Sequence, residues 1–398
     1  MFRIYSIYTD ASTVSTLLKV GNTRLKSSQK FLCTCPSRIF EYGKKFSTEN
    51  ISAYTMNETY PPSFDQPSNL HARKMEAQFV KHEWRDCLRD RFGRQHNYLR
   101  ISLTERCNLR CQYCMPAEGI SLSAPHSILL PQEIIRFANL CSQAGVIKLR
   151  LTGGEPTIRQ DFETIVRGLS EIKGISTFAM TTNGINLRKY LPLLKEVGLN
   201  SLNISLDTLI PAKYILISRR KGFDKVWHSI ESVLAENFCQ VKINCVVIKG
   251  FNDHEINDFV ALTEKWPVHV RFIEFMPFDG NHWSDKRIFT KKEMLQTIRS
   301  DYPLLQKLSP TRNETASLYT IPGFNGCIGL ISSMSDHFCS GCNRLRITAD
   351  GNLKNCLFGV KEYLVRDLLR SSISDDEIME TLRLAMLEKA KNHGGLYN

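Results

Sequence analysis

The sequence predicts an α/β protein built as an incomplete (β/α)6 barrel with a C-terminal extension. Six short β-rich runs alternate with longer helical runs from residue 98 onward. Strong turn signals, such as Thr-Asn-Gly at 182–184, follow the ends of the β-rich runs. The rhythm then changes after about residue 285, where shorter strand-like runs take over. We therefore expect a parallel sheet over the first part of the fold and an appended region after it.

The alternation assigns strands and helices in order. The six strands are expected at 98–104, 147–152, 176–182, 201–206, 241–248 and 268–275. The helices between them are expected near 131–144, 161–171, 187–197, 224–237 and 254–265. In barrels of this kind the reactive groups lie at the carboxyl ends of the strands.

The barrel is expected at 81–285, and a helix near 76–89 is expected where the folded part begins. The C-terminal region, 286–398, is expected to pack against the barrel. The expected elements are a helix at 290–300, strand-like runs at 317–321 and 327–333, a hairpin, and two helices at 361–370 and 375–391. The hairpin joins Leu345–Ala349 to Asn352–Cys356 through the two-residue turn Asp350-Gly351.

The N-terminal segment, 1–48, is basic and rich in Ser and Thr. It contains eight Lys or Arg residues against only Asp10 and Glu41. This composition is typical of a mitochondrial transit peptide, and it lacks the apolar core of a secretory signal. Residues 49–80 include three prolines and are expected to form a linker. These features predict a protein of the mitochondrial matrix, with a disordered basic tail as the alternative reading of the segment.

The net charge and the cysteine content limit which kinds of partner and chemistry the protein is expected to have. The net charge of the 398-residue chain is +12, which indicates an anionic partner such as a nucleic acid, a nucleotide or an acidic lipid. Half of this charge lies in the basic leader, and the barrel contains no dense basic run, which argues against nucleic acid. No window approaches 18 uninterrupted apolar residues, so no membrane span is expected. The 13 cysteines of this long chain favour metal or redox chemistry over a small disulfide scaffold.

The first cysteine cluster, Cys107, Cys111 and Cys114, follows the first strand directly with the spacing C-x3-C-x2-C. Three thiolates this close can hold three irons of a 4Fe-4S cluster and leave the fourth iron open to a small molecule. Zinc is the alternative, but a structural zinc site needs four protein ligands, and no histidine lies nearby.

The second cluster, Cys339, Cys342 and Cys356, spans the expected hairpin. It again supplies three thiolates, and either His337 or Cys327 could complete a zinc site, so zinc and a second 4Fe-4S cluster both remain open from spacing alone. Two further arginines, Arg344 and Arg346, are placed on one face of a strand. Paired guanidinium groups suit phosphate, although solvated surface arginines would give the same pattern.

The first cluster resembles the signature of the radical S-adenosylmethionine (SAM) enzymes, which adopt a partial TIM-type barrel. The resembling segments are Cys107-Asn-Leu-Arg-Cys111-Gln-Tyr-Cys114 and Thr152-Gly-Gly-Glu-Pro156. The resemblance implies that the open iron chelates SAM and that one electron cleaves it to a 5′-deoxyadenosyl radical. It implies SAM contacts at Tyr113, Gly154, Ser205 and Met276. We expect the two glycines to let the backbone approach this ligand closely.

The chain from about 95 to 393 further resembles the GTP 3′,8-cyclases, which begin molybdenum cofactor (molybdopterin) biosynthesis. The resemblance rests on both cysteine clusters and on segments such as Asp90–Arg94, Asn203–Asp207, Arg271–Met276 and Cys342–Arg346. It implies two 4Fe-4S clusters, with the guanine end of GTP on the second. It also implies GTP contacts at Arg100, Arg150, Thr181, Lys242, Arg344 and Arg346.

The implied reaction converts GTP and SAM to (8S)-3′,8-cyclo-7,8-dihydroguanosine 5′-triphosphate, 5′-deoxyadenosine and methionine. The clusters and the bound SAM carry this chemistry, and no further catalytic side chain is expected. The resemblance also implies a homodimer and, as pathway partner, the cyclic pyranopterin monophosphate synthase that consumes the product.

Two other functions fit parts of the sequence. One is a radical SAM enzyme that modifies a peptide or RNA, although no peptide-recognition element or longer cysteine array is visible. The other is a zinc-bearing nucleic-acid-binding protein. Family members end in a Gly-Gly pair, whereas this chain ends His393-Gly-Gly-Leu-Tyr-Asn398. We therefore expect the terminal tail to be missing and this form to lack activity for that reason, which GTP turnover with and without a supplied Gly-Gly peptide would test.

Overall fold

The computed structural model describes residues 84–278, 281, 283–309, 314–336 and 338–392. The expected leader, the linker and the chain end from 393 therefore lie outside the described residues. The initial helix expected at 76–89 is wrong over its described part, where 84–89 forms turns. The chain reverses there, because Arg89 bridges Gln95 and the His96 N–H donates to the Leu88 carbonyl at 2.8 Å.

The described strands form one sheet, in the order β12-β11-β10-β1-β2-β3-β4-β5-β6-β9-β8-β7. The six expected barrel strands are confirmed, each within two residues of its expected ends. They are β1 Tyr98–Ser102, β2 Lys148–Thr152, β3 Thr177–Thr182, β4 Ser201–Ser205, β5 Gln240–Val247 and β6 Val268–Glu274. All neighbouring pairs among these six are parallel.

The C-terminal strands extend this sheet at both edges. β10 (Arg344–Ile347) pairs in parallel with β1, and β9 (Cys327–Ile331) pairs in parallel with β6. Antiparallel strands lie outside them, namely β11 Asn352–Lys354, β12 Tyr363–Leu364, β8 Ser317–Thr320 and β7 Gln306–Lys307. The expected hairpin is β10-β11, but the two-residue turn is wrong, because β10 ends at Ile347 and residues 348–351 form the connection. The Gly351 N–H donates to the Thr348 carbonyl at 3.0 Å and closes a turn that begins two residues earlier than expected. The parallel part of the sheet is therefore wider than six strands.

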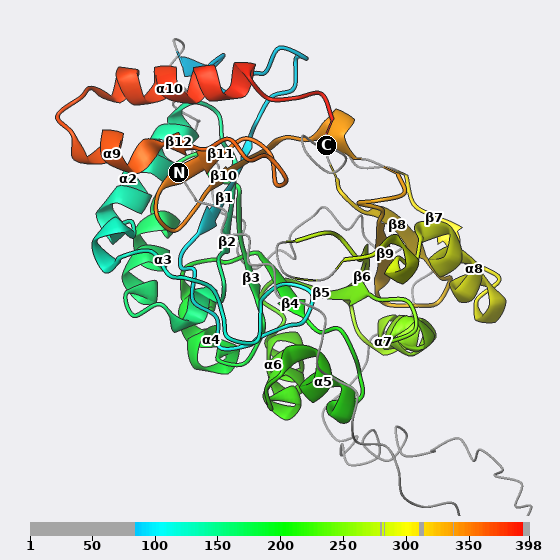
Figure 1. Cartoon of the computed structure of the whole chain (residues 1–398). Coiled ribbons are helices and arrows are strands. Elements are labelled where there is room, and N and C mark those ends of the chain that lie inside the picture. The colour runs from blue at the N-terminus through cyan, green and yellow to red at the C-terminus, as the bar shows by residue number, and fades with distance from the viewer. Residues whose placement is uncertain (1–83, 279–280, 282, 310–313, 337, 393–398) are drawn as a thin grey trace, which may run out of the picture. The chain divides into compact units, whose positions relative to one another are not determined.

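Helices cover the outer face of the sheet (Figure 1). The expected helices are α2 Pro131–Gln143, α3 Phe162–Ser170, α4 Leu187–Glu196, α6 Phe223–Glu236, α7 Ile256–Lys265, α8 Lys291–Asp301, α9 Val365–Arg370 and α10 Asp375–Leu387. One further helix, α5 (Pro211–Ser218), was not expected, because its Tyr-Ile-Leu-Ile run is also typical of a strand. Tyr214 and Ile217 of α5 are buried. No described helix combines the length and apolar character that crossing a membrane requires.

The two faces of the sheet differ in polarity. Leu99, Ile101, Leu149 and Leu151 alternate along β1 and β2 and are fully buried against the outer helices. The residues between them carry charged side chains on the inner face. The two edges of the sheet approach each other, because the Arg344 guanidinium on β10 donates to the Thr315 hydroxyl just before β8. This bond between opposite edges brings the inner face into an enclosed, barrel-like arrangement.

Candidate active site

The first cysteine loop, 107–114, lies at the carboxyl end of β1, as the sequence predicts. The three thiols are close enough to influence one another. Burial, followed by the charge of Cys107, raises the pKa of Cys114 to about 11. Among the described residues, no three Cys, His, Asp or Glu side chains converge as a single-ion site requires. A cubane cluster does not need this convergence, because each thiolate binds a different iron.

Helix α5 supports the first cysteine loop through hydrogen bonds at its C-terminal end. Its last carbonyls have no partner within the helix, and the loop provides the donors. The Arg110 N–H donates to the Ser218 carbonyl and the Gln112 N–H donates to the Ile217 carbonyl, both at 2.9 Å. The unexpected helix therefore holds the loop that carries the three cysteines.

Arg219 completes this support. It ends α5 in the left-handed conformation, with φ of 52°, which turns the chain out of the helix. Its guanidinium donates to the carbonyls of Arg110 and Met115, both at 3.1 Å. Two loop carbonyls on either side of Cys111 and Cys114 are thereby fixed.

The glycine pair after β2 packs against the same loop. The N–H of Gly154 donates to the Thr104 carbonyl at 2.7 Å. A Cβ at Gly154 would lie 2.1 Å from the Arg106 carbonyl oxygen, and one at Gly153 would lie 2.6 Å from the Thr104 oxygen. The glycines therefore permit close approach to the backbone that leads into the cysteine loop. The contact with SAM that we expected for Gly154 stays a prediction.

Glu155 connects two of the sequence motifs. It is fully buried, and burial raises the pKa of its carboxyl group. Its oxygens accept hydrogen bonds from the Thr157 hydroxyl at 2.6 Å, the Thr182 hydroxyl at 2.8 Å and the Asn183 N–H at 2.7 Å. The loops that follow β2 and β3 are thus fixed to one carboxylate beside the cysteine loop.

The residues expected to contact SAM lie around this end of the barrel. Ser205 ends β4, and Met276 follows β6. The buried Asn281 side chain joins the last of these segments to the cysteine loop, because its amide donates to the Met276 carbonyl at 2.8 Å and to the Tyr113 carbonyl at 3.1 Å. The structure thus gathers the expected SAM-binding segments at the carboxyl ends of the strands. Their contacts with SAM stay predictions.

Cationic side chains occupy the inner face between the two ends of the barrel. Strand register places the predicted Arg100, Arg150, Lys242, Arg344 and Arg346 there, together with Lys148 and Arg271, which the sequence reasoning missed. Arg150 is buried and donates to the Tyr98 hydroxyl at 2.5 Å and to the Thr181 hydroxyl at 3.3 Å. All six predicted GTP-contact residues therefore lie on one face.

The electrostatics of this face are unusual for a protein interior. Burial alone would raise the pKa of Tyr98, but Arg150, Arg100 and Lys148 outweigh it and lower that pKa to about 6. Burial, followed by Arg271 and Arg150, lowers the pKa of Lys242 to about 7. Burying this many cationic side chains close together costs free energy unless an anion neutralises them.

The same face holds polar atoms without partners. The side-chain oxygens of Asn203 and Asn244 and the Nε of Arg271 are buried and have no hydrogen-bond partner among the described residues. Unsatisfied buried polar groups of this kind call for an explanation, of which a bound ligand is one. Together with the cations, they form a site suited to a polar, polyanionic ligand.

The second cysteine cluster lies at the opposite end of the barrel from the first. Cys342 precedes β10, which is parallel to β1, and Cys356 follows the antiparallel β11 back to the same end. The expectation that reactive groups lie at carboxyl ends is therefore wrong for this cluster. The cysteines lie at the amino end of the parallel strands because Cys342 comes before β10 and Cys356 comes after β11, which runs antiparallel to β10. Across the five residues of β1, the ends are separated by about 13 Å at a rise of roughly 3.3 Å per residue.

Cys342 has a cationic environment. Burial alone would raise its pKa, but Lys389 and then Arg344 outweigh burial and lower the pKa of Cys342 to about 7. Arg94, in the predicted Asp-Arg-Phe-Gly-Arg motif, donates to the Cys339 carbonyl at 2.8 Å. A thiolate with charged and backbone support is what an iron or zinc ligand requires. His337, the alternative zinc ligand, lies outside the described residues.

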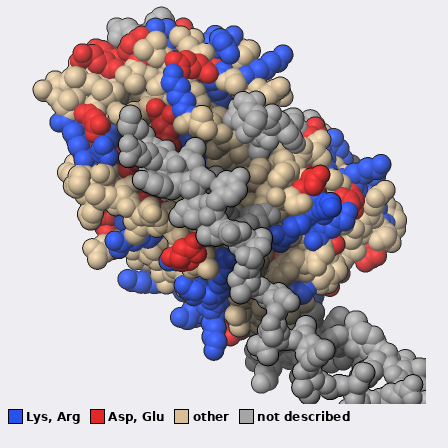
Figure 2. All heavy atoms as spheres, viewed as in Figure 1, with Lys and Arg blue, Asp and Glu red and all other residues tan. Residues whose placement is uncertain are grey.

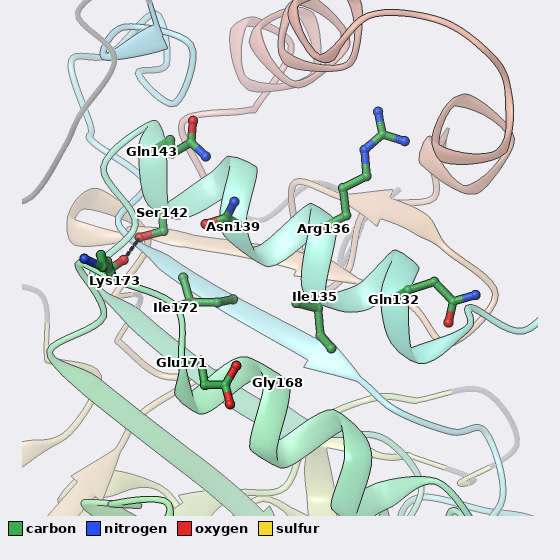
Figure 3. A pocket seen from close by; sticks show the side chains of 10 residues that line it. All are labelled: Gln132, Ile135, Arg136, Asn139, Ser142, Gln143, Gly168, Glu171, Ile172 and Lys173. Carbon is green, nitrogen blue, oxygen red and sulfur yellow. Dashed lines mark hydrogen bonds between the residues drawn. The ribbon is translucent and has the colours of Figure 1, made fainter.

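A separate groove lies in the outer helical layer, between α2 and α3. It has a volume of about 820 Å³ and is lined by Gln132, Ile135, Arg136, Asn139, Ser142, Gln143, Gly168, Glu171, Ile172 and Lys173 (Figure 3). None of these residues belongs to a strand, so the groove does not reach the cationic inner face. On the face shown in Figure 2, basic and acidic side chains are interspersed, without one uniformly basic surface.

Some residues that hold the loops of the site in place were not predicted from the sequence. Arg219 and Glu155 bond to backbone or hydroxyl groups far along the chain, which no local pattern reveals. Lys148 could have been found, because it lies two residues before the predicted Arg150 and so on the same face of β2. Arg271 pairs with Asn244, two residues beyond the predicted Lys242, and this register is visible only in the structure. Lys389, after α10, carried no sequence signal.

Comparison with known proteins follows the same division of the chain. Residues 101–263 match the Radical SAM superfamily, and residues 268–395 match the family Molybdenum Cofactor Synthesis C. The crystal structure of Streptococcus suis SuiB bound to S-adenosylmethionine matches with a TM-score of 0.51 at 16% identity. It covers 70% of this chain and 64% of SuiB, and this likeness supports the fold alone.

Two relatives are similar over most of this chain. Molybdenum cofactor biosynthesis protein 1 of Bos taurus is 53% identical over 78% of this chain and 49% of its own length, so the chain spans about half of that relative. The GTP 3′,8-cyclase, mitochondrial, of Arabidopsis thaliana is 48% identical over 89% of this chain and 90% of its own length. With both family models matched in order, the chain belongs to the radical SAM superfamily and, within it, to the GTP 3′,8-cyclase family of molybdenum cofactor biosynthesis.

Proposed function

We propose that this protein is a GTP 3′,8-cyclase, a radical SAM lyase that catalyses the first step of molybdenum cofactor biosynthesis. The observation that carries the proposal is the cationic inner face, which lies between two three-cysteine loops at opposite ends of one barrel. A triphosphate with about four negative charges needs several cations, and arginine forks fit its oxygens. The name of the Arabidopsis relative, GTP 3′,8-cyclase, supports the same substrate and a cyclisation reaction.

The residues at the carboxyl end provide the SAM site. Cys107, Cys111 and Cys114 would hold a 4Fe-4S cluster, which when bound supplies the electron that cleaves SAM to a 5′-deoxyadenosyl radical. Arg219 fixes carbonyls in and just after this loop, and Gly154 fixes the backbone that leads into it. Tyr113, Gly154, Ser205 and Met276 would contact SAM. Fixed backbone keeps the cofactor and substrate in one relative position, and position decides which C–H bond reacts.

The inner face provides the GTP site. Arg100, Arg150, Lys242, Arg344 and Arg346 would bind the phosphates, with Thr181, Lys148 and Arg271 beside them. Cys339, Cys342 and Cys356 would hold a second 4Fe-4S cluster that binds the guanine end. The chain's part is to anchor both ends of GTP so that ribose carbon 3′ faces the SAM site and water is excluded. No side chain is assigned a proton transfer.

An iron count with cysteine variants tests the two-cluster arrangement. After anaerobic reconstitution we expect about eight iron atoms per chain, since each cubane holds four. Replacing the first triplet by serine should leave about four and abolish SAM cleavage. Replacing the second triplet should also leave about four but retain SAM cleavage in the absence of GTP. A wild-type count near four would overturn the two-cluster proposal.

The relatives and the N-terminal composition also bear on the location of the protein, its assembly and its pathway partner. We propose that the protein acts in the mitochondrial matrix after removal of residues 1–48, as a homodimer, and that cyclic pyranopterin monophosphate synthase consumes its product. The name of the Arabidopsis relative supports a mitochondrial location.

A further inference from the structure

The segment that follows α10 reaches back to the second cysteine cluster. Lys389 lies two residues beyond the end of α10 and is only 3% exposed. Its ammonium donates to the Cys342 Sγ at 3.4 Å and to the Arg344 carbonyl at 3.0 Å. A lysine so completely buried is rare without a specific partner, and here the partners are the predicted cluster ligand and the first residue of β10.

The chain around Lys389 is fixed in this position. The Arg94 guanidinium donates to the Ala390 carbonyl at 2.7 Å and to the Lys391 carbonyl at 2.9 Å. The same guanidinium donates to the Cys339 carbonyl at 2.8 Å. One arginine therefore joins the segment that carries Lys389 to the loop that carries the second cysteine cluster. The buried Asp90 carboxylate holds that arginine in turn, at 2.5 Å from its Nε.

We propose that Lys389 is a positioning residue of the second cluster, which orients the Cys342 sulfur and donates a charge-assisted hydrogen bond to it. This proposal rests on the proposed function, because it requires a cluster at Cys339, Cys342 and Cys356. A hydrogen bond from a cation to a ligating sulfur stabilises the more negative, reduced state and raises the reduction potential of the cluster. It also strengthens retention of the cluster by holding the ligand in place.

The test isolates the second cluster in the full chain by replacing Cys107, Cys111 and Cys114 with serine. In this background, Lys389→Met removes the charge while keeping the length of the side chain. We expect iron loss to a chelator to increase by roughly 10- to 100-fold, the usual effect of removing a partner of a metal ligand. We also expect the reduction potential of the remaining cluster, measured by an EPR-monitored titration, to become more negative.

Two variants separate positioning from simple loss of folding. Lys391→Met is the matched control, because Lys391 lies in the same segment and is exposed, and it should change neither iron retention nor potential. Lys389→Arg keeps a cationic donor and should restore both in part. Unchanged retention and potential in Lys389→Met would overturn the proposal. Absence of iron from the parent background would instead contradict the second cluster itself, and so the proposed function.

Discussion

Each cation on the inner face of the barrel is costly to bury in the absence of an anion. Arg150 and Arg344 are both less than a tenth exposed, and the pKa of Arg346 is lowered to about 10 by burial and then by Arg100. Tyr98 offsets part of this charge, because the cations around it favour its phenolate. A triphosphate would neutralise the remainder. The chemistry of individual residues thus favours a nucleotide triphosphate over a neutral substrate.

Arg346→Ala should weaken GTP binding by about 10- to 100-fold, since hydrogen bonds to charged groups contribute roughly 1.5–3 kcal/mol each. Calorimetric titration with GTP measures this effect. SAM cleavage without GTP should be retained, because Arg346 lies away from the first cysteine loop. Arg383→Ala is the control, because Arg383 is exposed on α10 and pairs with Glu380. Equal losses of GTP binding and of GTP-independent SAM cleavage would contradict the role of Arg346.

GTP binding should take up protons at pH 8. The lowered pKa of Lys242, about 7, leaves most of this lysine neutral at pH 8 in the free enzyme, and bound phosphate favours its protonated form. Affinity should therefore fall as pH rises above 7. Calorimetry in buffers of different ionisation enthalpy measures the uptake, and Lys242→Met should reduce it by about one proton. Tyr98→Phe tests the second contribution, since its pKa of about 6 would rise beside phosphate. Equal uptake in all three proteins would contradict this assignment.

At the scale of elements, loops from three strands and one helix meet at the first cysteine loop. The sequence located the strands because alternation of apolar residues has a local signal. It did not locate α5, because its Ile-Leu-Ile run fits strand and helix alike. Nor did it reveal that Glu155 and Arg219 organise the loops, because the partners through which they join separate loops lie 27 or more residues away. Motif spacing thus located the ligands, whereas their support depends on tertiary contacts.

Gly154→Ala should displace the cysteine loop and remove the first cluster. Its Cβ would meet the Arg106 carbonyl at 2.1 Å, and a backbone atom there cannot move without moving the loop. Gly168→Ala on α3 is the matched control. Its Cβ would meet the flexible Ile135 Cδ1 at 2.2 Å, which can rotate away. Iron content and SAM cleavage should fall only in Gly154→Ala, and full activity of this variant would contradict the close packing of the loops.

At the scale of the whole molecule, the C-terminal region completes the barrel. The sequence predicted an extension packed against six parallel strands, and it located the β10-β11 hairpin, although the connection is four residues long and not two. It did not predict that β9 and β10 would join opposite edges of the sheet. The paired residues are 58 apart for β6 and β9 and 246 apart for β1 and β10, and register over such separations has no local signal. This arrangement places the second cysteine cluster at the end opposite to the first, with the cations between.

In the proposed reaction, SAM at one end of the barrel acts on the ribose of a nucleotide held between the two ends. One measurement tests this with GTP carrying deuterium at carbon 3′, under anaerobic reducing conditions, with and without a supplied peptide ending in Gly-Gly. The 5′-deoxyadenosine is then analysed by mass spectrometry. We expect one deuterium to be transferred to the 5′-deoxyadenosine and a cyclised nucleotide to form. Formation of 5′-deoxyadenosine without deuterium, at a rate that GTP does not change, would contradict it.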